Sequence, residues 1–355
     1  MKKFSRRTTG TVGLILVVAV VAGAILAGSA GASKSANIKV CVLLPDTKSS
    51  VRWVQFDPKY IGQALKKAKV TYSITNALND PQKMVAQADS CLSRGAKVAI
   101  VTDIAQGTSI AIEKKFAKAG GASIDYDRQV VGGVAKVYVA FDGTAVGAAQ
   151  ANGILKALKG KSKPTIAELW GGQTDQNAFW FKSGNDKVLN PKFKNGSLTK
   201  GPQQFVPDWL ATNAGPIFTQ MLTRTGNKID GAIAANDNIA GAIVAILKAK
   251  HLDPIALSGQ DATPAGVQNI ISGWQTMTVY KYVPTEANAA AAAAVAILRH
   301  KKIPGINGFR KNGSKKEPTV ALPVVSITKA NYTRLFKDKF LKKSDVCVGE
   351  FAKFC

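Results

Sequence analysis

Residues 98–128 read VAIVTDIAQGTSIAIEKKFAKAGGASIDYDR, and this stretch decides the fold. It starts with an apolar run at 98–102, continues with apolar residues at helical spacing over 108–118, and ends with a second apolar run at 122–126. The short runs predict buried strands, and the longer segment predicts a helix that connects them. Strands that alternate with helices in this way form a parallel sheet with helices on both faces.

The same alternation extends in both directions and then restarts. In the first half of the chain we expect further strands at 38–44, 70–75 and 136–141, with helices at 58–68 and 81–93. In the second half we expect strands at 165–169, 203–205, 231–235, 254–258 and 276–279, with helices at 143–158, 176–189, 212–223, 239–248 and 264–272. The sequence therefore predicts an α/β protein with two units of similar size in tandem.

The chain beyond residue 285 carries weaker signals. The alanine-rich run at 288–298 is too short to span a membrane and predicts a tightly packed helix. The polar segment 311–317 is rich in glycine and lysine, which indicates a surface loop. We expect a last strand at 321–327 and a last helix over 328–341, with Thr328 as its cap.

The first 32 residues have the three parts of a secretory signal peptide. Four basic residues open the chain, an apolar stretch covers 12–27, and the small residues 30–32 resemble a cleavage site. We therefore expect an exported protein that is cleaved after Ala32. The alternative is an uncleaved membrane anchor, because nothing between Arg7 and Lys34 is charged.

The chain is strongly basic, with 48 Lys and Arg against 22 Asp and Glu and a formal net charge of +26. Such a balance raises the possibility of nucleic-acid binding. The lysines are scattered, however, and no recognition motif or aromatic-interleaved basic stripe is present. We expect no nucleic-acid partner, and interpret the charge as a solvated surface that faces an anionic cell envelope.

Four cysteines in an exported chain indicate two disulfides, for which three pairings exist. The expected topology favours Cys41–Cys91, because the helix before the third strand crosses over the first strand. A loop of that size stabilises the fold by about 4 kcal/mol in the chain-entropy model. Cys347 and Cys355 would then close a short loop that holds the C-terminus.

Aromatic, charged and amide residues recur just past the predicted strands. They are Arg52, Trp53, Asp127, Arg128, Asn177, Trp209, Asn236, Asp237, Gln260, Asp261 and Lys281. Ligands of open parallel sheets bind outside the carboxyl ends of the strands. Flat aromatic faces suit the apolar face of a pyranose, and amide, carboxylate and guanidinium groups suit its hydroxyls. The sequence therefore predicts a site for a sugar or similar polyol.

Each of these residues alone has a simpler explanation as a helix cap or a structural ion pair. Asp237, for example, is placed to cap the helix that follows it. The recurrence at strand ends of both units is what favours one shared binding site.

Signs of catalysis are weak. His251 and His300 are the only histidines, and both lie in basic segments. The sequence has no His/Cys metal spacing, nucleophile elbow or phosphate-binding glycine loop. We expect no cofactor, no metal and no enzymatic activity. A secreted sugar-active enzyme stays open as an alternative, because Asp127 and Asp261 could act as a carboxylate pair.

Several segments resemble a known family, the periplasmic sugar-binding proteins that serve ABC importers. The resemblance covers about residues 38–343 and is most specific at Arg52-Trp53, Tyr126-Asp127-Arg128 and Gly259-Gln260-Asp261. The other matching segments are 44–51, 124–125, 141–142, 171–178, 235–237, 258–262 and 275–281. Within the family, the xylose-binding and multiple-sugar-binding branches are the most similar.

The resemblance implies a type I periplasmic binding protein, with two doubly wound parallel-sheet lobes joined by three crossovers. These crossovers would fall near 141–144, 279–285 and 318–325. The N-terminal lobe would comprise 37–142 and 285–320, the C-terminal lobe 143–284 and 321–345, and the disulfide-pinned tail 346–355. The implied sugar contacts are Arg52, Trp53, Asp127, Arg128, Asn177, Trp209, Asn236, Asp237, Asp261 and Lys281. Gln176 and Pro207-Asp208 depart from the family pattern.

The implied function is capture of a monosaccharide, in particular an aldopentose such as D-xylose or a related aldohexose. The partners would be that sugar and the membrane permease of an ABC importer, with the protein acting as a monomer in the periplasm or at the outer face of the cell membrane. A sugar sensor that presents its ligand to a membrane receptor kinase is an alternative. A sugar-responsive transcription regulator would need an N-terminal helix-turn-helix where this chain has a signal peptide.

Overall fold

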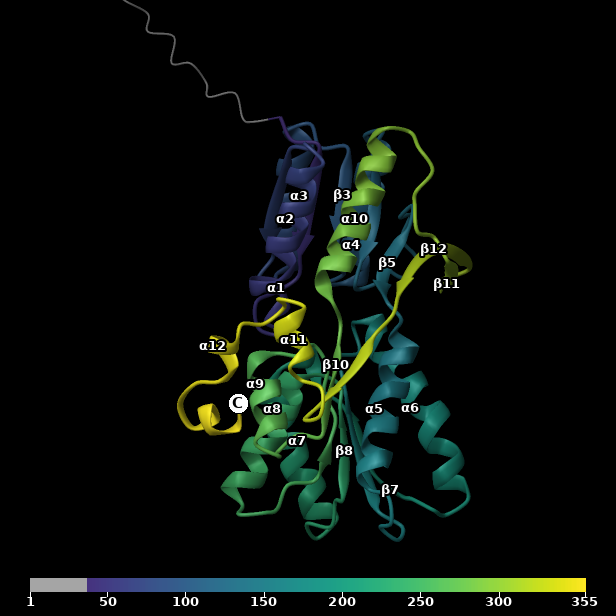
Figure 1. The fold of residues 1–355 in the computed structure, drawn as a ribbon. Coiled ribbons are helices and arrows are strands. Elements are labelled where there is room, and N and C mark those ends of the chain that lie inside the picture. The colour runs from purple at the N-terminus through teal and green to yellow at the C-terminus, as the bar shows by residue number, and fades with distance from the viewer. Residues whose placement is uncertain (1–36) are drawn as a thin grey trace, which may run out of the picture. The chain divides into compact units, whose positions relative to one another are not determined.

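The computed structural model describes residues 37–355. The predicted signal peptide at 1–32 lies outside the described residues. The α/β class expected from the alternating pattern is confirmed, because helices cover the faces of two largely parallel sheets. Each sheet forms the centre of one lobe (Figure 1).

The first lobe is built on a seven-stranded sheet. In spatial order its strands are β11 (Gly308–Asn312), β12 (Lys315–Leu322), β5 (Tyr138–Phe141), β4 (Ala122–Tyr126), β3 (Val98–Val101), β1 (Val40–Leu44) and β2 (Tyr72–Asn76). All neighbouring strands are parallel except β11 and β12, which form an antiparallel hairpin at one edge. Parallel strands need crossover connections, and helices provide them.

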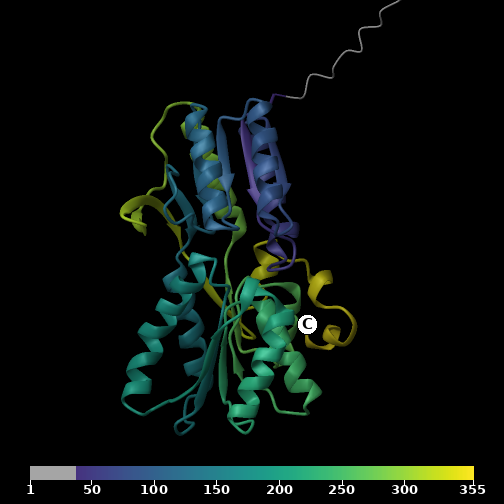
Figure 2. The same ribbon diagram turned by 180° about the vertical axis from the view of Figure 1, so that it is seen from behind.

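Helices cover both faces of this sheet. They are α1 (Arg52–Gln55), α2 (Asp57–Lys67), α3 (Pro81–Ser93), α4 (Gln106–Lys118) and α10 (Val283–Leu298). Alternate side chains of β1 point to opposite faces, so Val40 and Leu44 pack with α2 and α10, whereas Cys41 and Leu43 pack with α3 and α4. Figure 2 shows α3 and α4 from behind, as the blue helices in front of the sheet. This double cover explains why β1, β3, β4 and β5 are fully buried.

A disulfide joins Cys41 on β1 to Cys91 on α3, with the two Cα atoms 5.9 Å apart. A second disulfide joins Cys347 to Cys355. This is the pairing that the expected topology favoured. The second bond closes the tail, in which α12 (Lys343–Val346) and the 3-10 helix η2 (Gly349–Phe354) lie against α9.

The second lobe has a four-stranded parallel sheet in the order β7 (Thr199–Phe205), β6 (Thr165–Trp170), β8 (Gly231–Ala234) and β9 (Ala256–Leu257). Next to it, β10 (Met277–Tyr280) pairs antiparallel with β13 (Val325–Thr328). The helices of this lobe are α5 (Gly143–Ala157), α6 (Gln176–Lys194), α7 (Ala211–Arg224), α8 (Asp237–Ala249) and α9 (Pro264–Ile271).

Helices α5 and α6 approach each other closely at two glycines. A Cβ atom on Gly147 would clash with the carbonyl oxygen of Phe181, and one on Gly184 would clash with that of Thr144. Only glycine allows this backbone approach. The contact fixes α6, whose first turn carries Asn177 toward the other lobe.

The chain passes between the lobes at 141–143, 280–283 and 322–325. At the third passage, the single strand expected at 321–327 is not found. That segment is divided, because β12 ends at Leu322 in the first lobe and β13 begins at Val325 in the second lobe. The extended conformation was predicted from the pattern, and the resemblance implied a crossover near 318–325. The error was to expect one unbroken strand there.

Two other expectations near the C-terminus were wrong. The segment 311–317 is a hairpin between β11 and β12 rather than a loop, and Glu317 is buried within it. The helix expected over 328–341 is reduced to α11 (Arg334–Lys337). Residues 329–333 form turns instead, and within them the Asn331 side chain accepts a hydrogen bond from the Thr328 backbone.

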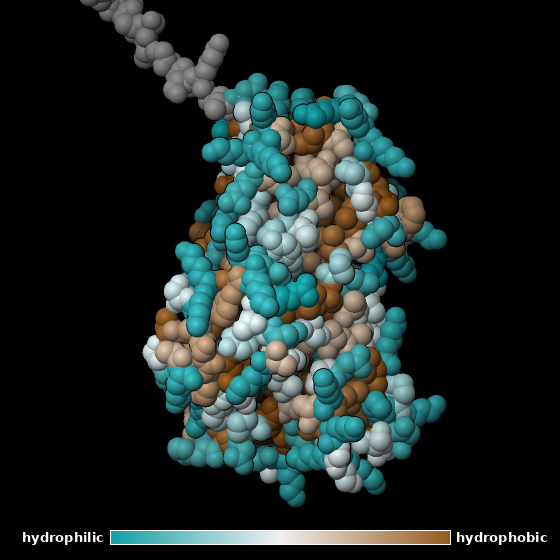
Figure 3. Space-filling model, viewed as in Figure 1, coloured by the Kyte–Doolittle hydropathy of each residue, from teal (hydrophilic) through white to brown (hydrophobic). Residues whose placement is uncertain are grey.

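Hydrophilic side chains are spread over both lobes on the face shown in Figure 3. Within residues 37–355, no helix combines the length and apolar character needed to cross a membrane.

Candidate ligand-binding site between the lobes

A cavity lies between the lobes at the carboxyl ends of their strands. Its lining residues are Ser49, Ser50, Arg52, Trp53, Asp127, Arg128, Asp175, Asn177, Phe181, Trp209, Asn236, Gln260, Asp261 and Lys281. The residues predicted from sequence are thus brought together, except for Asp237. The volume open to the centre of a water molecule is about 20 Å³, room for one or two waters. The walls are closely packed, so a larger ligand requires the lobes to move apart.

Arg52 is the charged centre of the first-lobe wall. It lies on α1, is 2% exposed, and donates to Asp57 through Nε and Nη2, to Asp127 through Nη1 at 2.5 Å, and to Glu286 through Nη2 at 2.5 Å. A guanidinium has five N–H donors, and four are used here. One Nη1 N–H is left for a ligand. Three carboxyl groups therefore hold Arg52 in one orientation.

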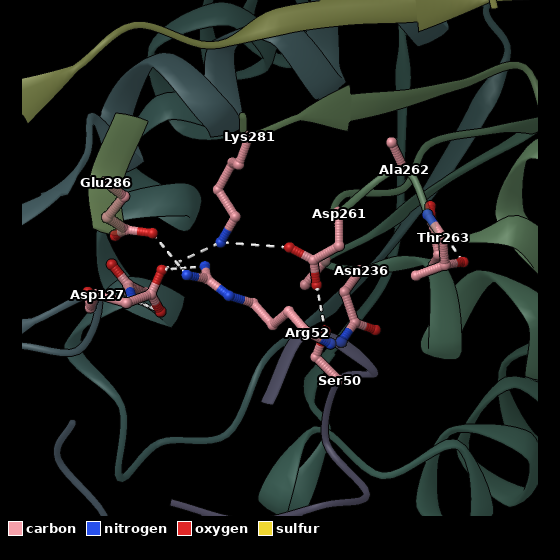
Figure 4. A network of polar contacts seen from close by, with 12 residues as sticks. Ser50, Arg52, Asp127, Asn236, Asp261, Ala262, Thr263, Lys281 and Glu286 are labelled. Carbon is pink, nitrogen blue, oxygen red and sulfur yellow. Dashed lines mark hydrogen bonds and ion pairs between the residues drawn. The ribbon is translucent and has the colours of Figure 1, made fainter. Parts of the chain in front are cut away.

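Asp127 connects Arg52 to the second lobe. Its carboxylate lies 3.3 Å from Lys281 Nζ, and Lys281 lies 3.3 Å from Asp261 (Figure 4). Burial alone would raise the pKa of Asp127, but the charges of Arg52, Lys281 and Arg128 lower it to about 2. Burial lowers the pKa of Lys281, yet Asp127 and Asp261 outweigh it and raise that pKa. Both groups therefore stay charged at neutral pH.

Glu286 completes the buried cluster from α10 and is shown beside Arg52 in Figure 4. Burial raises the pKa of Glu286 to about 8, more than the charge of Arg52 lowers it. A neutral Glu286 still accepts the hydrogen bond from Arg52. The sequence pattern did not identify Glu286, because it lies 234 residues from Arg52, just before the alanine-rich run that was expected only to be a packed helix.

Arg128 forms the other polar corner of the cavity. Its Nε lies 3.0 Å from Asp175 of the second lobe, and its Nη2 donates to Ser49 Oγ at 3.0 Å. Burial raises the pKa of Asp175 to about 6 against the lowering effect of Arg128. This pair links the lobes directly across the cavity.

Amide side chains add further interlobe hydrogen bonds. Asn177 Nδ2 donates to the Asp127 carbonyl at 2.9 Å, and Asn236 Nδ2 donates to the Ser49 carbonyl at 3.0 Å. Ser50 Oγ donates to Asp261 Oδ2 at 2.8 Å. Each of these contacts joins a strand-end residue of one lobe to the other lobe, so the site forms only when the lobes meet.

Two tryptophans line the cavity. The guanidinium groups of Arg52 and Arg128 contact the Trp53 ring, 4.5 Å and 5.4 Å from its centroid. Trp209 packs on Gly171, where a Cβ atom would overlap the indole ring. Phe181 meets Trp209 edge-on, with centroids 5.9 Å apart. These contacts hold both indoles in fixed positions.

Some buried polar atoms of the lining residues have no partner among the residues that the structure describes. Trp209 Nε1 is a donor of this kind, and Gln260 Oε1 is an acceptor. Leaving a buried polar group without a partner costs about 1–3 kcal/mol. A ligand that both donates and accepts hydrogen bonds would satisfy them.

The backbone of the lining is strained at three residues. Asp127, Trp209 and Asp261 have φ values of 58°, 60° and 91°, in the left-handed region that non-glycine residues rarely occupy. Each such residue costs of order 1–3 kcal/mol and is typical of functional sites. This strain orients the three side chains where the strands end.

Asp237 lies behind the cavity rather than in its lining. Its Oδ2 accepts from the Thr263 N–H at 2.8 Å, and its Oδ1 accepts from Gln275 Nε2 at 2.9 Å. Gly259 and Gly266 pack against this carboxylate so closely that a Cβ on either would clash with it. Asp237 thus positions the loop that carries Gln260 and Asp261, and burial raises its pKa to about 7.

Sequence reasoning missed Ser49, Ser50, Asp175 and Phe181 among the lining residues. Ser49 and Ser50 lie just before Val51, the N-cap residue of the short helix α1, and Asp175 is the N-cap of α6. Their positions next to predicted site residues were the available signal. Within residues 37–355, no group of three or more His, Cys, Asp or Glu is arranged to hold a metal ion.

Comparison with known proteins defines the class. Residues 18–302 match the model of a periplasmic binding protein domain, and the chain belongs to this family. The D-xylose-binding periplasmic protein of Escherichia coli (strain K12) is 29% identical over 317 residues, which cover 89% of this chain and 94% of that protein. The multiple sugar-binding periplasmic receptor ChvE of Rhizobium radiobacter is 28% identical over 319 residues, covering 84% and 89% of the two chains.

A solved structure agrees with these relatives. A carbohydrate transporter solute-binding protein from Chloroflexus aurantiacus, in complex with D-glucose, has a TM-score of 0.79 and 29% identity over 86% of this chain and 97% of that chain. The relatives are solute-binding proteins, not enzymes. The type I periplasmic binding protein fold expected from the sequence is confirmed.

Proposed function

We propose that this protein captures a monosaccharide between its lobes and delivers it to the membrane permease of an ABC importer. The observation that carries the proposal is the cavity itself. It combines two fixed indoles with buried, unpartnered donors and acceptors at the point where the lobes meet. A sugar ring has an apolar face for the indoles and hydroxyls for the polar atoms.

The sugar contacts that we propose follow from this geometry. Trp53 and Trp209 would lie against the ring, and the remaining Nη1 N–H of Arg52 would donate to a hydroxyl. Arg128, Asn177, Asn236, Asp261 and Lys281 would exchange hydrogen bonds that now join the lobes for bonds to the sugar. The relatives named as D-xylose-binding proteins favour an aldopentose such as D-xylose.

Delivery would depend on lobe movement. The three chain passages between the lobes are short, and closure about such segments is typical of binding proteins. A sugar that contacts both lobes would favour the closed form, because it binds that form better than the open one. The permease could then distinguish loaded from empty protein. The family and the predicted signal peptide are consistent with an exported protein that acts outside the cytoplasm.

Tryptophan fluorescence tests the proposal, since Trp53 and Trp209 both line the cavity. The purified protein should be titrated with D-xylose, L-arabinose, D-glucose, D-galactose and D-allose. We expect a saturable change with at least one of them, and loss of that response in Trp209→Ala. If none of these sugars gives a saturable change, the proposed function is wrong.

A further inference from the structure

A second pocket adjoins the monosaccharide cavity. It is formed by Asp103, Gln106 and Gln129 of the first lobe together with Gln173, Gln176 and Phe179 of the second lobe. The volume open to the centre of a water molecule is about 300 Å³ in this pocket, compared with about 20 Å³ in the cavity. This volume is in the range of pockets that hold small ligands.

The two sites are built from residues that are neighbours in the chain. Gln129 directly follows Arg128, and Gln176 directly follows Asp175. Arg128 and Asp175 line the cavity and form an ion pair at 3.0 Å, whereas Gln129 and Gln176 line the pocket.

The pocket has the chemistry of a polyol site. Asp103 is 4% exposed and Gln129 is 1% exposed, yet Asp103 Oδ1 and Gln129 Oε1 have no hydrogen-bond partner among the described residues. The Gln129 side chain is held by a hydrogen bond that its Nε2 donates to Glu317 at 2.9 Å. Both orphan atoms are acceptors closed off from solvent, and hydroxyl groups are donors that would satisfy them once the two side chains turn toward the pocket.

Phe179 contributes an aromatic surface to the same pocket. Its side chain is 39% exposed, and Phe205 packs against it with centroids 5.2 Å apart. Gln173 and Gln176 stand near it in sequence and offer amides that donate and accept. An aromatic surface beside amides and a carboxylate repeats the composition of the monosaccharide cavity.

We propose that this pocket is a second sugar subsite, so that the protein also binds a disaccharide with one ring in the cavity and the other beside Phe179. This inference rests on the proposed function, because the first ring needs the monosaccharide cavity. It also accounts for Gln176, which departs from the family pattern and lines the pocket, not the cavity.

Isothermal titration calorimetry tests the subsite. The protein is titrated with D-xylose, β-1,4-xylobiose and methyl β-D-xylopyranoside, and with D-glucose, cellobiose and methyl β-D-glucopyranoside. The variants are Phe179→Ala and Asp103→Asn. Phe309→Ala is the matched control, since Phe309 is 65% exposed on β11 and does not line the pocket.

We expect one disaccharide to bind at least as tightly as its monosaccharide and about tenfold more tightly than the methyl glycoside. Each subsite variant should lower the affinity for the disaccharide about tenfold and change the affinity for the monosaccharide less than about twofold. These changes correspond to about 1.4 and 0.4 kcal/mol of binding free energy. Phe309→Ala should change neither.

Two outcomes would overturn the inference and leave the proposed function intact. In the first, a monosaccharide binds but neither disaccharide does. In the second, a disaccharide binds no better than the methyl glycoside and is unaffected by Phe179→Ala and Asp103→Asn. If no sugar of either size binds, the proposed function and the subsite both fail.

Discussion

Replacing Asp127 with asparagine should destabilise the protein, because Asp127 neutralises Arg52 and Lys281 in a buried site. Asparagine has the shape of the neutral acid but no charge. The pKa of Asp127 falls from 3.8 to about 2 on folding, and each pKa unit corresponds to about 1.4 kcal/mol. Asp127→Asn should therefore lower the free energy of unfolding by about 2.5 kcal/mol at pH 7. Breaking a buried pair costs up to about 3–5 kcal/mol, so this value is a lower limit.

Urea unfolding at pH 7, followed by far-UV circular dichroism, measures the loss. The matched control is Asp89→Asn, which breaks an exposed pair with Lys115 at 2.7 Å and should cost less than about 1 kcal/mol. The pH dependence gives a second check. A lowered pKa means that the stabilisation by Asp127 is present above about pH 4 and is lost as the pH falls toward 2. An Asp127→Asn variant within about 0.5 kcal/mol of the wild type would refute this reasoning.

Three further predictions concern pH, ligand and disulfide. Because the pKa of Glu286 is raised to about 8, its contribution to stability is present below about pH 4.5 and declines as the pH rises through 8. In Glu286→Gln the urea midpoint should therefore change less with pH between 5 and 8 than in the wild type, and the same pH dependence in both proteins would contradict this reasoning. Trp209→Ala should lower sugar affinity at least tenfold in calorimetry with little change in the circular dichroism spectrum, whereas full affinity would remove Trp209 from the site. A Cys41→Ser, Cys91→Ser double variant should lose about 4 kcal/mol of stability, and a thermal midpoint equal to the wild type would argue against that disulfide.

The parts of the fold that depend on local patterns were predicted well. The segment quoted first became β3, α4 and β4 with only small shifts at the ends, because apolar spacing over a few residues determines both strand and helix. The C-terminal region was predicted poorly. The break of the strand at 323–324 and the shortness of α11 depend on contacts that periodicity does not report, although the resemblance implied a crossover near 318–325.

In the site too, features set by local sequence were predicted and features set by distant contacts were not. The positions of the predicted strand ends indicated where polar side chains would gather, since the carboxyl ends of parallel strands meet at one edge. The partners of Arg52 were not predictable, because Glu286 comes from a helix more than 200 residues away. Asp237 was expected to touch the ligand, with a helix cap as the alternative. It lies outside the cavity lining, and α8 is capped by Asn236 and not by Asp237. The contacts that fix its place come from Thr263 and Gln275, 26 and 38 residues further along the chain, which local sequence does not report.

The central claim is that a monosaccharide binds between the lobes in contact with both. A crystal structure of the protein with the sugar that titrates most tightly tests it most directly. We predict electron density for one sugar ring between Trp53 and Trp209, with hydrogen bonds to Arg128 of the first lobe and Asn236 of the second. A sugar bound elsewhere, or held by one lobe alone, would contradict the account.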